Sequence, residues 1–105
     1  MVSPILMEIV STIVRCVAPN RVVVFGSQAR GDAGPVSDID LFIELDTRLR
    51  PPERAAAIAA LFPLHPWSLD VVVYTPEEVA RLRGVHGTLL ATIEAEGKLV
   101  YERAA

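Results

Sequence analysis

The residues best suited to chemistry lie in one stretch, where two acidic side chains follow a glycine–serine pair. Gly26 and Ser27 end an apolar run, and Asp38 and Asp40 come just before a second one. A glycine there lets a ligand approach the backbone, and a helical turn that starts there offers free amide groups to an anion. Residues two apart in a strand share a face, so the two carboxylates lie side by side. The pattern predicts a phosphate-binding site beside a cation-binding site.

Asp70 is the third acidic candidate, because it begins another apolar run. If that run forms a strand beside the strand of Asp40, three carboxylates converge. Hard oxygen ligands suit Mg²⁺ or Mn²⁺ better than Zn²⁺, and three acids can hold two divalent ions. The plainer alternatives are a common glycine–serine turn, a solvated acid pair at a strand entrance and a solubilising charge at position 70.

The elements that must position these residues alternate between helix and strand. Serine, threonine and proline at helix starts and apolar residues at helical spacing predict helices over residues 4–18, 51–62, 76–83 and 88–96. β-Branched runs and alternation predict strands over 21–25, 39–45 and 69–74, and a short strand or extended tail over 98–102. A short helical turn is expected at 27–30. The fold class is α/β (α+β), a single domain over 1–105 with helices packed on a small mixed sheet of three to four strands.

Composition narrows the possible environments and partners. A net charge of −3 does not favour direct nucleic-acid binding through a basic surface. The single cysteine, Cys16, excludes an intrachain disulfide and is expected to pack as a small helix residue. No signal peptide or membrane span is recognisable, so a cytoplasmic location is expected. Apolar residues make up 51% of the chain, which is high for 105 residues and fits a surface buried by a partner or in a homodimer.

The spaced motif resembles the signature of the minimal nucleotidyltransferases, the MNT domains of the DNA polymerase beta-like nucleotidyltransferase superfamily. The residues that carry the resemblance are Gly26-Ser27-Gln28-Ala29-Arg30-Gly31-Asp32 and then Ser37-Asp38-Ile39-Asp40-Leu41. The similarity extends to Leu69-Asp70-Val71-Val72 and to the segment 96–102. It therefore covers nearly the whole chain.

The resemblance implies a nucleotidyltransferase fold and a role for each motif residue. Gly26 and Ser27 would hold a nucleoside triphosphate, with ATP the expected substrate. Asp38 and Asp40 would bind Mg²⁺, with two ions expected, and Asp70 would complete the metal site and help to deprotonate the attacking hydroxyl. The reaction would transfer a nucleoside monophosphate and release pyrophosphate.

Four further side chains keep alternative roles. Arg30 either contacts the triphosphate or forms a structural ion pair. Ser37 either caps the turn into the second strand or assists the nucleotide. Glu44 shares the face of Asp40 and could assist the site, but a solvated position is the simpler interpretation. Trp67 is expected to pack near the third strand, and stacking on a base is the alternative that nothing in the sequence supports. Surface roles are expected for the two histidines, His65 and His86.

The resemblance also implies a partner. Small proteins of this family often pair with a HEPN-domain toxin and act as its antitoxin, in some cases by adding AMP to a tyrosine of the toxin. A second hypothesis is a non-catalytic binding module that silences the HEPN partner by complex formation. A third is a transferase for small molecules such as aminoglycosides, which the lack of an acceptor-gripping domain disfavours.

Overall fold

The fold is built on one mixed four-stranded sheet. In this computed structural model the described residues are 3–26, 29, 38–65 and 67–104. The strands are β1 (Arg21–Phe25), β2 (Ile39–Glu44), β3 (Leu69–Tyr74) and β4 (Lys98–Glu102), in the spatial order β3-β2-β1-β4. β1 is antiparallel to both β2 and β4, whereas β2 and β3 are parallel. The predicted mixed sheet of α+β class is therefore confirmed.

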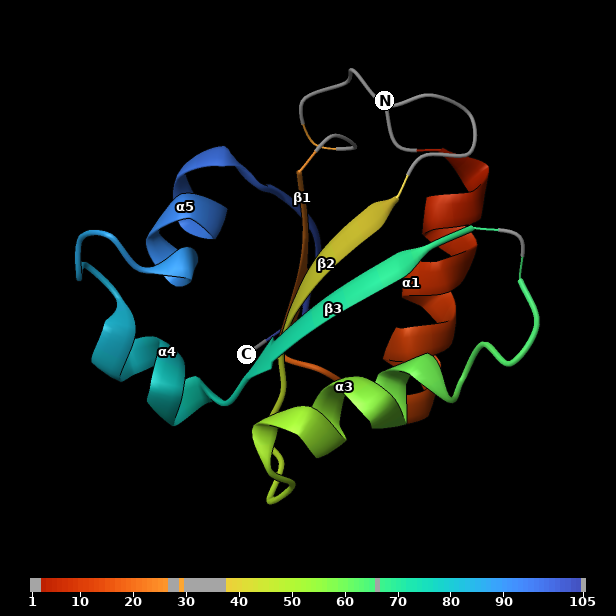
Figure 1. The fold of residues 1–105 in the computed structure, drawn as a ribbon, viewed down its shortest axis with the longest axis horizontal. Helices are drawn as coiled ribbons and strands as arrows, with labels where there is room; N and C mark the ends of the chain where they lie inside the picture. The colour runs from red at the N-terminus through yellow and green to blue at the C-terminus, as the bar shows by residue number, and fades with distance from the viewer. Residues whose placement is uncertain (1–2, 27–28, 30–37, 66, 105) are drawn as a thin grey trace.

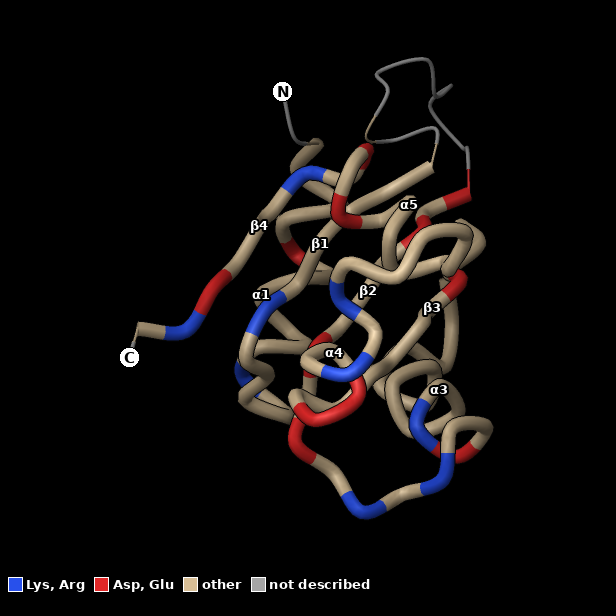
Figure 2. The backbone as a smooth tube through the Cα atoms, turned by 90° about the vertical axis from the view of Figure 1, so that its left-hand side faces the viewer, with Lys and Arg blue, Asp and Glu red and all other residues tan. Residues whose placement is uncertain are grey.

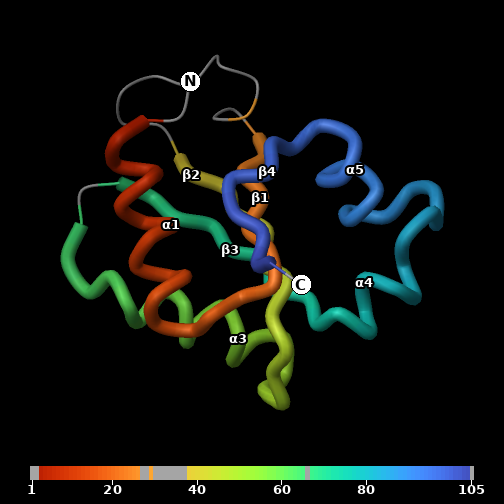
Figure 3. Tube along the Cα trace, turned by 180° about the vertical axis from the view of Figure 1, so that it is seen from behind, coloured from red at the N-terminus to blue at the C-terminus, as the bar shows by residue number. Residues whose placement is uncertain are grey.

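Four described helices cover the two faces of this sheet. They are α1 (Pro4–Val17), α3 (Pro51–Ala59), α4 (Pro76–Leu82) and α5 (Leu89–Glu96). α1 and α3 lie on one face and α4 and α5 on the other (Figures 1 and 3). The predicted helix starts are confirmed, because Ser3, Thr75 and Thr88 each accept a hydrogen bond from a backbone N–H three residues later.

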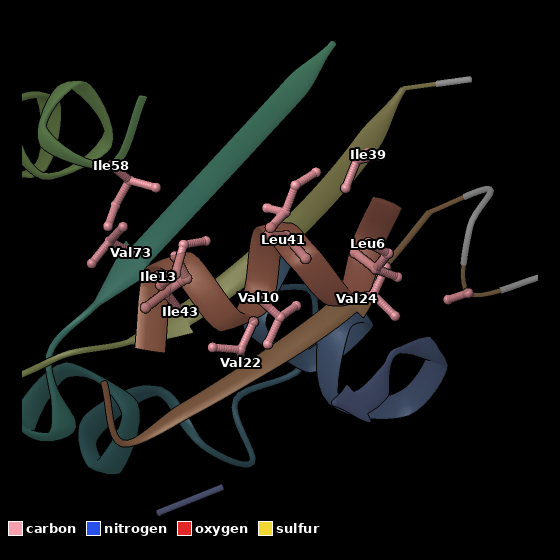
Figure 4. Packing of buried hydrophobic residues seen from close by; sticks show 12 residues of the cluster. Leu6, Val10, Ile13, Val22, Val24, Ile39, Leu41, Ile43, Ile58 and Val73 are labelled. Carbon is pink, nitrogen blue, oxygen red and sulfur yellow. The ribbon is translucent and has the colours of Figure 1, made fainter. Parts of the chain in front are cut away.

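The face under α1 and α3 holds the larger core. Its buried members are aliphatic and include ten side chains from both helices and three strands that are labelled in Figure 4: Leu6, Val10, Ile13, Val22, Val24, Ile39, Leu41, Ile43, Ile58 and Val73. The opposite face holds a smaller cluster of Val23, Phe42, Val79, Leu90 and Ile93. Because β1 contributes valines to both clusters, it is a central strand buried on both faces, as its unbroken apolar run predicts.

Charged side chains tie α5 to the sheet. Arg21, at the start of β1, lies 2.8 Å from Glu44 of β2 and 2.6 Å from Glu94 of α5. The hydrogen bond from Arg21 lowers the pKa of Glu94, although partial burial opposes this shift. The predicted solvated position of Glu44 is therefore wrong, because its carboxylate is a mostly buried ion-pair partner.

Arg54 of α3 joins three elements from a buried position. Its guanidinium donates to the carbonyls of Leu49 and Val73 and pairs with Glu78 of α4 at 2.7 Å. Arg54 is only 8% exposed, so this charge depends on those partners.

The surface differs from the sequence prediction at one residue. Cys16 is exposed, so its predicted packed position is wrong. Basic and acidic positions are interspersed along the backbone (Figure 2). Among the described helices, none is long and apolar enough to cross a membrane.

Candidate active site

Asp40 and Asp70 are neighbours across the parallel pair β2–β3. The register places the Cα of Asp40 opposite that of Asp70. Both residues lie near the start of their strands, where the backbone N–H of Ile39 donates to the carbonyl of Ser68 at 2.8 Å. Residues in register on adjacent strands point to one face, so both carboxylates project from the face that carries α4 and α5. The predicted adjacency of these two acids is therefore present.

Gly26 makes room for the carboxylate of Asp40. The Cα of Asp40 lies opposite Phe25, the last residue of β1, so the next residue of the chain passes close to its side chain. A Cβ built on Gly26 would lie 2.3 Å from Oδ2 of Asp40, and the φ of Gly26 is +70°. Both the space and the backbone conformation favour glycine. The sequence predicts that Gly26 lets a ligand approach the backbone. The structure shows that Gly26 also leaves space for the carboxylate of Asp40.

Gly26 also bonds to Ala29, the next residue that the structure describes. The backbone N–H of Ala29 donates to the carbonyl of Gly26 at 3.1 Å, and Ala29 is buried in the core beneath α1. Gly26 is thus tied to the core through its bond with Ala29 and lies next to Asp40. Ser27, Arg30 and Ser37 lie outside the described residues, so their predicted roles in nucleotide binding stay predictions.

Asp38 lies at the entrance to β2, two residues before Asp40, and is exposed. Among the residues that the structure describes, no group of three acidic, histidine or cysteine side chains has the geometry of a metal site. The structure therefore brings two of the predicted acids into register but does not gather all three. The available donors are carboxylate oxygens at a strand end, which fit Mg²⁺ or Mn²⁺ in kind.

Trp67 lies two residues before β3 and packs against the larger core. Its indole meets the ring of Phe62 edge-on, with 5.5 Å between ring centroids. The exposed ring of His65 stacks on the indole of Trp67, with 3.9 Å between ring centroids. The expected packing role of Trp67 is therefore present. Glu44 lies at the opposite end of β2 from Asp40, with Arg21, and is not part of the candidate site.

The comparisons with known proteins agree with this arrangement. The model of the nucleotidyltransferase domain family matches residues 5–103. A search of curated proteins found no match. A crystal structure of a candidate nucleotidyltransferase from Sulfolobus solfataricus resembles this fold with a TM-score of 0.61, at 22% identity, over 91% of this chain and 76% of that one. At that identity the likeness concerns the fold, whereas the family match spans nearly the whole chain. The chain belongs to the nucleotidyltransferase domain family.

Proposed function

We propose that this protein is a Mg²⁺-dependent nucleotidyltransferase that moves AMP from ATP to a hydroxyl of a partner protein. Membership of the family supports nucleotidyl transfer in general. The observation that carries the proposal is the register of Asp40 with Asp70 beside the turn at Gly26. Following the resemblance in sequence, the acceptor is a tyrosine of a HEPN toxin, and the protein acts as its antitoxin.

Three aspartates of this chain would bind the divalent ions and accept the proton of the attacking hydroxyl. Asp38, Asp40 and Asp70 are the residues that would hold divalent ions, which when bound neutralise charge on the triphosphate and the leaving group. The acceptor oxygen attacks the α-phosphorus, the bond to the β-phosphate oxygen breaks, and pyrophosphate leaves with the electron pair. Asp70 is exposed at the start of β3, where it can accept the hydroxyl proton.

The exposure of the acidic residues supports a large acceptor. Both Asp38 and Asp70 are exposed, and the two strand starts that carry them lie at one end of the sheet (Figure 1). A tyrosine on the surface of a second protein can reach such a position without entering a closed pocket.

Mass spectrometry tests this proposal. Incubation with ATP, Mg²⁺ and a HEPN protein encoded beside this one should add one or more AMP units to the partner. The double variant Asp38→Ala, Asp40→Ala should add none. The control is Asp46→Ala, an exposed acid beyond the far end of β2, which should behave as the original protein does. Transfer by the double variant would show that the site is wrongly assigned.

A non-catalytic antitoxin is the second candidate. The observation that favours it is the lack of a three-ligand metal cluster among the described side chains. Neutralisation of the toxin would then survive the double variant as long as the complex forms. A neutralisation assay and the mass measurement on the same variant separate the two functions.

A further inference from the structure

The outer side of α1 is an exposed surface with both apolar and charged residues. The inner side of this helix buries Leu6, Ile9, Val10 and Ile13 against the sheet. Away from the sheet, Ile5 is 45% and Met7 44% exposed. Figure 3 shows α1 on the outside of the sheet, at the opposite side of the molecule from α4 and α5.

A groove runs along this surface. Its volume is about 450 Å³, and it is lined by residues of α1 together with Phe62 and Trp67 from the connection between α3 and β3. Two exposed apolar side chains and an indole are costly to leave in water, so this groove is suited to being covered.

Two charges on the outer side of α1 are available for an external partner. Glu8 and Arg15 are exposed, and neither forms an ion pair with another residue in the described part of the chain. They are seven residues apart, which is about two helical turns, so they lie on one line along the helix. Ser11 and Thr12 lie midway between them and carry short side chains, so another helix can approach closely there.

We propose that α1 pairs antiparallel with α1 of a second copy of this chain. The two-fold axis passes between Ser11 and Thr12, so Glu8 of each copy faces Arg15 of the partner subunit. The line of charges is then self-complementary, as a two-fold interface requires. Parallel pairing would instead place Glu8 against Glu8 of the partner subunit and Arg15 against Arg15 of the partner subunit.

A second copy of the chain is less suited to pair through the edge strand β4 than through α1. β4 pairs with β1 through a bulge between Val22 and Val23. A bulge twists an edge strand and disrupts the regular ladder that a second strand needs. No comparable obstacle exists on α1, which is a regular helix over its whole length. The pairing does not depend on nucleotidyl transfer.

Sedimentation equilibrium tests the pairing. A contact centred on one helix pair is at the small end of specific interfaces and is therefore weak, so the protein concentration should run from about 1 µM to about 1 mM. The original protein should form dimers at the upper concentrations. Glu8→Arg and Arg15→Glu should each weaken the dimer about tenfold or more, because each change acts twice across the two-fold axis and replaces attraction by repulsion. The double variant Glu8→Arg, Arg15→Glu should restore it.

Two controls keep the result specific to α1. Glu77→Arg and Arg48→Glu make the same charge changes at exposed positions elsewhere and should leave the dimer unchanged. Ser11→Cys in a Cys16→Ser background should give a covalent dimer on oxidation, whereas Ala57→Cys in that background, on the exposed side of α3, should not. A monomer across the whole range, a dimer insensitive to both single charge reversals, or failure of the double variant to restore association would overturn the proposal.

Discussion

Gly26→Ala is the sharpest test of how the candidate site is built. The added Cβ would lie 2.3 Å from Oδ2 of Asp40, whereas real Cβ contacts are essentially never shorter than 3.0 Å. The carboxylate must therefore move by roughly 0.7 Å or more, and a displacement of about 1 Å at a reacting centre costs about 100-fold in rate. We expect the rate of AMP transfer to fall about 100-fold, together with most of the stabilisation of the protein by Mg²⁺ and ATP.

Backbone strain must be separated from the clash with Asp40. A non-glycine residue in the left-handed region costs about 1–2 kcal/mol, which lowers the melting temperature by several degrees in a chain of this size. Gly84 provides a matched control, because its φ is +84° and a Cβ there meets nothing within 4 Å. Gly84→Ala should show the loss of stability without the loss of activity. Equal transfer rates for Gly26→Ala and Gly84→Ala would refute the claim that Gly26 positions Asp40.

Three further changes test the interactions that hold the sheet and helices together. Arg54→Met should lower the free energy of unfolding by about 2–3 kcal/mol in urea titrations, because it leaves the partly buried carboxylate of Glu78 without its partner. Hydrogen bonds from arginines lower the pKa values of Glu78 and Glu94 below 4.5, so stability should be full above that pH and fall as the pH is lowered past it. Gly97→Ala should cost about 1–3 kcal/mol in melting experiments, because its Cβ would lie 2.5 Å from Cγ1 of Val23.

Each of these changes has a second variant that isolates its cause. Arg48→Met removes an exposed arginine and should leave the urea midpoint nearly unchanged. Glu94→Gln should flatten the loss of stability at low pH, and an unchanged slope would contradict the assigned ion pair. Gly87→Ala adds a Cβ with no neighbour within 4 Å at φ +82°, so it reports the cost of strain alone. Gly97 has an ordinary φ of −77°, so its loss reports packing alone, and a loss well below about 1 kcal/mol would contradict the packing argument.

Much of the fold is predictable because its signals are local. The strands 21–25, 69–74 and 98–102 have the predicted bounds, since β-branched runs and flanking turns mark them directly. The helices begin where proline follows a capping residue or where a threonine caps. The adjacency of Asp40 and Asp70 could be stated only as a condition, because the order of strands in a sheet depends on long-range pairing that no local pattern encodes.

The error at Glu44 and the unpredicted burial of Arg54 arise where a charged residue finds a distant partner. Glu44 alternates with apolar residues as a solvated charge would, but Arg21 from another strand draws it into an ion pair. The burial of Arg54 could not be predicted, since an arginine in a short helix with four alanines suggests an outward position. Its burial depends on Val73 and Glu78, which lie about twenty residues later. The role of Gly26 toward Asp40 likewise depends on a cross-strand contact.

The pairing of β4 with β1 has a consequence for how the chain folds. β1 lies between β2 and β4, and these two neighbours are separated by more than fifty residues of sequence. Until β4 is synthesised and docks, β1 presents one unpaired edge with three consecutive valines. Such an edge is a template for aggregation, and pairing over so long a sequence separation slows folding. The β4 segment therefore protects the nascent protein from self-association through β1, in addition to completing the sheet.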